Sequence, residues 1–375
     1  MHVVIVPDSF KENLTAIEVA DAIGDGVLDV APQAQVSKFP FSDGGEGSLD
    51  VLCRHAQGKL ISCATSNALG EPIEAQYFLF EDGHTAWIEL SQAAGLAQIL
   101  PNKRNILKAT TYGTGLQIRD AINKGCTHII LGVGGSATND GGAGIFQALG
   151  GKLLDQQGNS LAYGGQHLKN LDRIVPPKSM EHMQWTIACD VENPLLGPYG
   201  ATQTYGPQKG ASPDMIEDLE FGLTHFSNLI FQRYNRDIRS LKGGGAAGGT
   251  AAGMFGFFNA TVKSGFSLLA QMTALERILS QADLIYTGEG KIDAQSLHGK
   301  LTVAVARLGK KHKIPVIGLG GTIEGPYDTL YQEGFSGIFS IQKGPISLEE
   351  SKTNASQLLR DASSRITQLY ALAKP

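Results

Sequence analysis

The sequence predicts an α/β protein of two domains, with a parallel sheet built from both chain ends and a mixed six-stranded sheet in an inserted domain. Three observations predict this class. A length of 375 residues is enough for two domains. Apolar β-branched runs alternate with amphipathic stretches near both ends of the chain. Between them, from about residue 59, strand-like runs follow one another without room for crossover helices.

The first elements are predicted to be a strand, a helix and a strand. Residues 2–6 (HVVIV) form a β-branched run that stops at Pro7, and an amphipathic stretch covers about 15–30. The next strand begins at Gln35 in QVSKFPFSDGG. The pattern then changes to three runs separated by turn signals, namely KLISCATSN, EAQYFLFEDG and TAWIELS. These runs predict the start of a different, antiparallel sheet.

Alternation of helices and strands returns after this meander. Strands are predicted at 128–135 (HIILGVGG), at GKLLD and at 184–191 (QWTIACDV), and with the three meander runs they make six strands. A helical pattern at 213–233 and the run GGGAAGGTAAG follow, and for the run we favour close packing over ligand contact. The final apolar runs predict buried parallel strands at 282–290, 312–321 and 334–342.

The simplest assembly assigns residues 1–59 and 263–375 to the parallel-sheet domain and residues 60–262 to the inserted domain. A cleft between two domains is the default place for a ligand, so we expect the site there. One large α/β domain is the alternative that this pattern leaves open.

Composition and charge exclude several classes. Glycine is abundant, at 47 residues, and its doublets between apolar runs indicate glycine-rich loops. The formal net charge of −5 without a basic run argues against nucleic acid and membrane partners. Four separate cysteines without a C-x-x-C pair favour a reducing compartment. No run approaches 18 apolar residues, so we expect a soluble, cytoplasmic protein.

Five segments place charged or hydroxyl residues among glycines after apolar runs. They are PDSFK (7–11), SDGGEG (42–47), GGSATNDGG (134–142), ACDVENP (188–194) and TGEGKIDAQS (287–296). Ligands of open α/β sheets bind at the carboxyl ends of strands, where glycines let a phosphate approach the backbone. Asp and Glu side chains at such an edge can hold Mg²⁺. These segments therefore predict a site for a phosphorylated ligand.

Each segment also has a plainer interpretation. Asp43 and Asp190 can be turn residues, and the hydroxyls around Ser136 and Thr138 can cap the next helix. Lys11 can be a solvated surface lysine. TGEGKID can be a solvated loop, although its alternating charges favour one functional rim.

Other functional classes stay open at this point. No P-loop and no G-x-S-x-G elbow is present. Residues 132–137 (GVGGSA) satisfy G-x-G-x-x-A after a strand, and Asp155 lies near the ribose-binding distance, which keeps an NAD-dependent dehydrogenase in view. Against it, Asp140 would place a charge beside the pyrophosphate. A non-catalytic sensor of sugar acids is a third class.

In order, the segments PDSFK, FSDGGEG, TYGTG, LGVGGSATNDGGAG, CDVENPLLGPYGA, YGPQKGA, GGGAAGG and TGEGKIDAQSLHGK resemble the glycerate kinase type-1 family over about residues 3–321. The resemblance implies a flavodoxin-like domain from both chain ends and an inserted domain with a mixed six-stranded sheet. It implies ATP-dependent phosphorylation of D-glycerate, in bacterial members usually at the 2-hydroxyl, in glyoxylate or sugar-acid catabolism. Phosphorylation at the 3-hydroxyl is the alternative, and whether the chain forms a homodimer stays open.

Residue roles follow from the chemistry of phosphoryl transfer, which needs positioning, Mg²⁺, positive charge and a proton acceptor. We expect Lys11 and Lys291 to hold the substrate carboxylate and the ATP phosphates, and Asp43 or Asp190 to accept the hydroxyl proton. Glu289 and Asp293 are the expected Mg²⁺ ligands. The expected contacts to substrate or phosphate come from Ser9, Gly44, Gly45, Gly134, Gly135, Ser136, Thr138, Asn139, Gly141 and Gly142.

Overall fold

The computed structural model describes residues 1–10, 13–42, 45–178, 180–298 and 301–373. The chain divides into two units, Met1–Asp43 with Leu269–Pro375, and Gly44–Leu268. We call them the terminal unit and the central unit. The divisions fall beside 43/44 and 268/269 rather than the expected 59/60 and 262/263, because helix α2 (Ser48–His55) packs against strands of the central unit.

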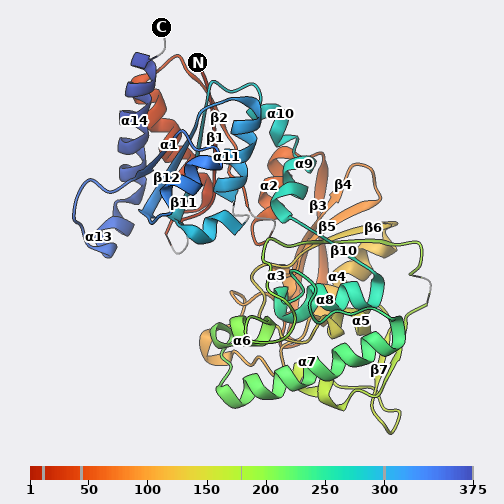
Figure 1. The fold of residues 1–375 in the computed structure, drawn as a ribbon. Coiled ribbons are helices and arrows are strands. Elements are labelled where there is room, and N and C mark those ends of the chain that lie inside the picture. The colour runs from red at the N-terminus through yellow and green to blue at the C-terminus, as the bar shows by residue number, and fades with distance from the viewer. Residues whose placement is uncertain (11–12, 43–44, 179, 299–300, 374–375) are drawn as a thin grey trace. The chain divides into compact units, whose positions relative to one another are not determined.

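The terminal unit is a doubly wound parallel sheet with the strand order β13-β12-β11-β1-β2 (Figure 1). Numbered within the unit this order is 2-1-3-4-5, the flavodoxin-like arrangement. All four neighbouring pairs are parallel. The strands are β1 (His2–Pro7), β2 (Gln35–Lys38), β11 (Leu284–Ile292), β12 (Val316–Ile323) and β13 (Gly337–Ser340). The fold class expected for the two chain ends is confirmed.

Helices α1 (Ala16–Val30) and α14 (Ala355–Ala373) bury one face of this sheet against the apolar side chains of β1 and β11. Helix α1 begins at Thr15, whose hydroxyl and Glu18 form a reciprocal capping box. The remaining helical segments are α10 (Leu275–Leu279), η4 (Ala294–His298), α11 (Leu301–His312), α12 (Tyr327–Gln332) and α13 (Leu348–Thr353).

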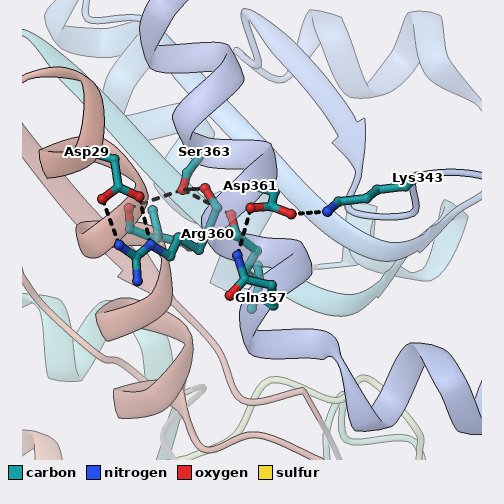
Figure 2. Close-up of polar contacts among 8 residues, drawn as sticks. Asp29, Lys343, Gln357, Arg360, Asp361 and Ser363 are labelled. Atoms are coloured by element: carbon teal, nitrogen blue, oxygen red, sulfur yellow. Dashed lines mark hydrogen bonds and ion pairs between the residues drawn. The ribbon is translucent and has the colours of Figure 1, made fainter.

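The first and last helices of the chain are held together closely (Figure 2). The guanidinium of Arg360 donates to both carboxylate oxygens of Asp29, at 2.7 Å each. Gly26 permits the contact, since a Cβ there would lie 2.2 Å from the carbonyl oxygen of Arg360 and from the hydroxyl of Ser363. The Ser363 hydroxyl donates to the carbonyl of Ile23. The two chain ends therefore close a single hydrophobic core.

The central unit contains the mixed sheet, in the order β10-β9-β6-β5-β4-β3. The meander β3-β4-β5 is antiparallel, whereas β5, β6, β9 and β10 are parallel neighbours. The strands are β3 (Gly58–Ser66), β4 (Pro72–Phe80), β5 (Thr85–Glu89), β6 (His128–Gly132), β9 (Gln184–Ala188) and β10 (Thr261–Lys263). The mixed six-stranded sheet is confirmed.

One member of that sheet was assigned wrongly. The segment GKLLD forms β7 (Lys152–Leu154), which pairs with β8 (Arg173–Val175) in a separate antiparallel ribbon. The sixth strand of the sheet is β10, which has three residues and follows the glycine-rich run. Helices and turns of the unit are α3 (Ser91–Ala94), η1 (Pro101–Lys103), α4 (Tyr112–Asn123), α5 (Ala143–Ala148), η2 (Gly165–Asn170), α6 (Ala201–Tyr205), η3 (Pro207–Lys209), α7 (Pro213–Tyr234), α8 (Ala246–Phe258) and α9 (Gly265–Met272), which runs across the division.

Aromatic packing supports the helical side of the central unit. The rings of Phe146 and Phe257 stack with centroids 3.9 Å apart, and Phe226 meets Phe257 edge to face. This cluster fixes α5, α7 and α8 together beside the loop that follows β6. No helix in the described ranges combines the length and the apolar composition needed to cross a membrane.

Candidate active site

In the terminal unit, the candidate residues gather where the strand order reverses. Strand β1 lies between β2 and β11, so the crevice at the carboxyl ends of β1 and β11 is the topological switch point. The loop after β1 starts at Asp8, whose N–H donates to the carbonyl of Gly288 in β11. Ser9 follows, and its N–H donates to the Asp8 carboxylate at 2.6 Å. Lys11 lies outside the described residues.

The acidic segment TGEGKID (287–293) is largely strand. Residues 287–292 belong to β11 itself, and Gly288 and Glu289 pair with β12. Glu289 is buried, and its Oε1 accepts the hydroxyls of Ser296 at 2.9 Å and Thr302 at 2.7 Å. The alternative of a solvated loop is therefore excluded, and the strand predicted at 282–290 continues to Ile292 because pairing with β12 extends it across the glycines.

Lys291 and Asp293 lie further along the same segment, at the carboxyl end of β11. The ammonium of Lys291 lies 2.9 Å from the Glu324 carboxylate and 3.4 Å from that of Asp293. The hydrogen bond to Glu324 raises the pKa of Lys291, so the side chain is a permanent cation. Asp293 is buried at 8 % exposure, and its backbone N–H donates to Ser296. One cation and two buried acids thus meet at the switch point.

These acids fit a magnesium ion of the kind that nucleotide enzymes use. Mg²⁺ is commonly held by one or two carboxylates together with phosphate oxygens and water, so a larger protein cluster is not needed. Glu289 and Asp293 supply two carboxylates, and Ser296 and Thr302 orient the first. Within the described ranges, no group of three or more His, Cys, Asp or Glu side chains could hold a metal by itself.

In the central unit, four parallel strands end at one edge of the sheet. Sequence reasoning missed the acid at the end of β5, Glu89, which is 2 % exposed. Its Oε1 accepts the Ser48 hydroxyl at 2.9 Å and the Leu49 N–H at 2.8 Å. Burial raises the pKa of the Glu89 carboxyl, and these donors oppose the rise. Ser48 also accepts the Trp87 indole N–H, so the group anchors α2 to β5.

Gly134 and Gly135 begin the loop that follows β6. A Cβ on Gly134 would lie 2.8 Å from the Cα of Gly45, so only glycine allows this approach. Gly135 is exposed and has a φ of +68°. The neighbouring Ser136 is 8 % exposed. Asp43 and Gly44, which precede Gly45, lie outside the described residues.

Asp140 ends this loop as a wholly buried structural acid. Its carboxylate accepts the N–H and hydroxyl of Thr111, at 2.8 and 2.9 Å, and the N–H groups of Gly142 and Gly144. The expected capping of α5 by the hydroxyls near Ser136 is wrong, since Asp140 binds those first-turn N–H groups instead. Asp140 faces the protein, so it would not stand beside a bound phosphate.

The backbone N–H groups of the last two loop residues, Gly141 and Gly142, already have protein acceptors and are not available to an anion. The Gly141 N–H donates to the carbonyl of Gly248, and the Gly142 N–H donates to Asp140. The expected contacts of Gly141 and Gly142 with phosphate therefore give way to structural hydrogen bonds. Gly253 packs as closely, since a Cβ there would lie 1.8 Å from the carbonyl oxygen of Gly141. The glycine-rich run thus supports the loop by close packing.

Thr138 and Asn139 lie in the middle of the loop with unmet polar capacity. Both are fully buried. The Asn139 amide donates to the Thr202 hydroxyl at 3.1 Å. Among the described residues, neither the Thr138 hydroxyl oxygen nor the side-chain amide oxygen of Asn139, Oδ1, has a hydrogen-bond partner. Buried atoms of this kind usually have a protein or water partner.

Lys209 was given no role from the sequence, although it lies within YGPQKGA. Its side chain is 3 % exposed, and its ammonium donates to the Ser136 hydroxyl at 2.8 Å and the Thr138 carbonyl at 2.7 Å. Burial lowers the pKa of Lys209 to about 7, and the charge of Asp140 opposes the change. Sequence offers one weak signal for this burial, a lysine between Pro207 and Gly210 in a tight turn.

Asp190 lies two residues beyond β9, at the same edge of the sheet. The side chain is partly exposed, and its Oδ2 accepts the N–H of Phe266 at 3.0 Å in the first turn of α9. One carboxylate oxygen thus anchors a helix, as a turn-forming or capping acid would.

The dinucleotide interpretation finds little support. Asp155 forms a tight turn in which its Oδ1 accepts the N–H groups of Gln157 and Asn159. The preceding β7 pairs with β8 and not with β6, so G-x-G-x-x-A opens no βαβ unit. The geometry that would bring Asp155 to a ribose is missing from this part of the described chain.

A doubly wound unit with acids at its switch point and a central unit with a lysine-supported glycine loop define an α/β enzyme that acts on small anions. The model of the "Glycerate kinase family" matches residues 3–371, and the chain belongs to that family. It is therefore an enzyme, a phosphotransferase with an alcohol group as acceptor.

Individual relatives agree over the full length. The chain is 40% identical to a glycerate kinase of Bacillus subtilis, covering 100% of this chain and 99% of the relative. It is 40% identical to a glycerate 2-kinase of Escherichia coli, covering 99% and 98%. A crystal structure described as a glycerate kinase 2 from Salmonella typhimurium LT2 has a TM-score of 0.84 at 40% identity, covering 100% of this chain and 99% of that one.

Proposed function

We propose that the protein transfers the γ-phosphoryl group of ATP to the 2-hydroxyl of D-glycerate, giving 2-phospho-D-glycerate. The observation that carries this proposal is the match to a glycerate 2-kinase of Escherichia coli over 99% of the chain. Sugar-acid or glyoxylate catabolism is the metabolic setting that we propose with it. The four cysteines are free thiols, which supports a reducing compartment such as the cytoplasm. A homodimer stays a prediction.

The terminal unit supplies the groups that suit a nucleotide. Ligands of doubly wound sheets bind at the switch point, where Ser9 and Lys291 lie at the ends of β1 and β11. Glu289 and Asp293 would hold Mg²⁺, which supplies positive charge to the phosphate oxygens. Lys291 would stabilise the same charge as a fixed cation. Lys11 would serve the phosphates or the substrate carboxylate.

The central unit supplies groups that suit a small hydroxy acid. In the strand-end loops, Gly135 is exposed and Gly134 is partly exposed, and the buried Gly45 and Ser136 lie next to them. Asp190 would accept the proton of the attacking hydroxyl while that oxygen forms a bond to the γ-phosphorus and the bond to the bridging oxygen of ADP breaks. Asp43 is the second candidate for this proton. Both acids belong to segments that follow strands.

Phosphorus NMR tests the reaction and its position together. The purified protein is incubated with ATP, Mg²⁺ and D-glycerate, and the product is compared with 2- and 3-phosphoglycerate. A 2-phosphoglycerate signal supports the proposal. A 3-phosphoglycerate signal would keep the kinase and reverse the orientation of the substrate, whereas no organic phosphate from a folded preparation would refute glycerate as the acceptor.

A further inference from the structure

A lysine as deeply buried as Lys209 requires a compensating interaction, because removing an ammonium group from water is costly. The side chain reaches from η3 into the loop after β6, where Ser136 and Thr138 accept its hydrogen bonds. Asp140 contributes opposite charge to it, but that carboxylate is already bound by Thr111 and by backbone N–H groups. The ammonium group of Lys209 thus makes its hydrogen bonds to the loop after β6.

The two contacts determine what the Ser136 hydroxyl can do. In its protonated form the Lys209 ammonium only donates hydrogen bonds, so the oxygen of Ser136 then accepts from Lys209. The hydroxyl hydrogen of Ser136 is then left to donate to another group. Ser136 is buried at 8 % exposure, and its neighbours Gly134 and Gly135 are more exposed, so a ligand would approach it over these glycines. The arrangement presents a hydrogen-bond donor backed by positive charge.

We infer that Lys209 is a positioning residue that holds the Ser136 hydroxyl as a donor to a carboxylate oxygen of D-glycerate. The inference rests on the proposed function, since it takes glycerate as the anion. It adds Lys209 to the residues that determine substrate affinity, and it assigns a direction to the Ser136 hydrogen bond.

The unmet polar atoms of the same loop support a ligand here. The Thr138 hydroxyl oxygen and the side-chain amide oxygen of Asn139 lack partners among the described residues. Both residues lie at the backbone carbonyl of Thr138, which accepts the hydrogen bond from Lys209. The carbonyl of Thr138 is fixed by the lysine, so the loop is held in place while part of its polar surface is unsatisfied. Buried polar atoms usually have a hydrogen-bond partner in the protein, in water or in a ligand, and these two side chains have none within the described chain.

A carboxylate suits this loop better than a nucleotide phosphate chain. The cation is single and lies behind one hydroxyl, and the N–H groups of Gly141 and Gly142 are already used. A triphosphate requires several N–H donors or cations, and the switch point of the terminal unit offers Lys291 with two acids for a metal. The loop of the central unit is therefore assigned to the smaller anion.

The test measures binding of D-glycerate without ATP by calorimetry and, separately, the steady-state KM values and kcat. The variants are Ser136→Ala, Lys209→Met, Lys209→Arg and the double variant Ser136→Ala/Lys209→Met. Lys169→Met is the matched control, because Lys169 is a lysine of the same unit that pairs with Asp218 at the surface. Melting temperatures are recorded for every variant.

Ser136→Ala and Lys209→Met are each expected to weaken D-glycerate binding by about tenfold or more, the size of a charge-assisted hydrogen bond. The double variant should lose little beyond either single variant, because the two residues act through one contact. The KM for ATP and the kcat should change much less. Lys209→Arg should recover part of the affinity, and Lys169→Met should match the wild type.

Additive losses in the double variant would overturn the inference, as would a Lys209→Met protein with wild-type affinity and only a lower melting temperature. An increase confined to the KM for ATP would overturn the assignment of glycerate to this loop. If Lys209→Met does not fold, the D-glycerate affinities of Ser136→Ala and Lys209→Arg still test the inference. Wild-type protein that binds D-glycerate without phosphorylating it would refute the proposed function alone, whereas absence of binding would refute the inference.

Discussion

The carboxylate of Asp140 accepts the backbone N–H of Thr111 at 2.8 Å, so the acid that ends the loop after β6 also fixes the start of α4. Five hydrogen bonds from Thr110, Thr111, Gly142 and Gly144 converge on this one side chain. The loop, α4 and α5 are consequently joined at a single buried charge.

Asp140→Asn should lower the stability of the central unit by about 3–5 kcal/mol, because the amide would present hydrogens to a site that contains only donors. Thermal and urea unfolding would measure the loss. Asp155→Asn is the control, since Asp155 lies in an exposed turn where an asparagine can accept the same N–H groups. Unchanged unfolding of Asp140→Asn would contradict the structural role.

Near pH 8, Lys209 should take up a proton when the protein binds D-glycerate. In the free protein burial lowers the pKa of Lys209 to about 7, against the opposing effect of the Asp140 charge, so the amine is mostly neutral at that pH. A bound carboxylate favours the ammonium and raises this pKa. Calorimetry at pH 8 in buffers of different ionisation enthalpy should show uptake approaching one proton in the wild type and none in Lys209→Met. Equal proton uptake in the wild type and in Lys209→Met would exclude Lys209 as the group that takes up the proton.

The same pKa predicts how stability depends on pH. In the unfolded chain Lys209 keeps a pKa near its ordinary value of 10.5, so between about pH 7 and 10 the unfolded state binds more protons than the folded state. Folding stability from this group therefore rises as the pH increases through that window. Melting curves should show the wild type gaining relative to Lys209→Met from pH 7 to 9. A constant difference would argue against the lowered pKa.

Glu289→Gln should raise the Mg²⁺ concentration needed for half-maximal activity by about tenfold or more, because it removes one charged ligand while the Ser296 and Thr302 hydroxyls still have an acceptor. The readout is phosphoryl transfer against total Mg²⁺ at fixed ATP. Glu333→Gln, which removes an acid paired with Arg307 elsewhere in the unit, is the control. Identical Mg²⁺ curves would remove Glu289 from the metal site.

Asp190→Asn should reduce kcat by about 100-fold or more with a small change in the KM for D-glycerate, as expected when a proton acceptor is lost. The asparagine oxygen can still accept the N–H of Phe266, so α9 should stay anchored. Glu192→Gln is the neighbouring control, because Glu192 pairs with Lys242 at the surface. A wild-type kcat would transfer the role to Asp43, which Asp43→Asn tests in the same assay.

Much of the fold could be predicted because it depends on local pattern. The β-branched runs of β1 and β11 and the turn signals of the meander specify strands within a few residues, and the parallel order follows from alternation with helices. Strand β10 escaped prediction, since three residues carry no period, and GKLLD looked like a sheet strand although it forms a ribbon with β8. Pairing partners of such short segments are decided by tertiary packing.

The site could be predicted only in part, for a related reason. Sequence placed Ser136 and Asp190 at strand ends, and the topology brings their strands, β6 and β9, side by side. It could not show that Lys209 turns inward or that Asp140 faces the protein, because burial of a charge depends on contacts made far along the chain. Lys209 and Asp140 are two of the charges around the loop, and the Glu46 carboxylate beside Gly135 is a third.

Because α14 packs against α1, the core of the terminal unit can be completed only after the last helix has been translated. Residues 44–268 are continuous, so the central unit has all its strands as soon as that stretch has emerged. The terminal unit has only β1, α1 and β2 until then, and the face of α1 that meets Arg360 and Ser363 stays uncovered until the last helix is translated. Completion of the core of the terminal unit is thus one of the final events in the making of this enzyme, and a chain truncated before α14 would have all strands of the central unit but a terminal unit whose α1 stays uncovered.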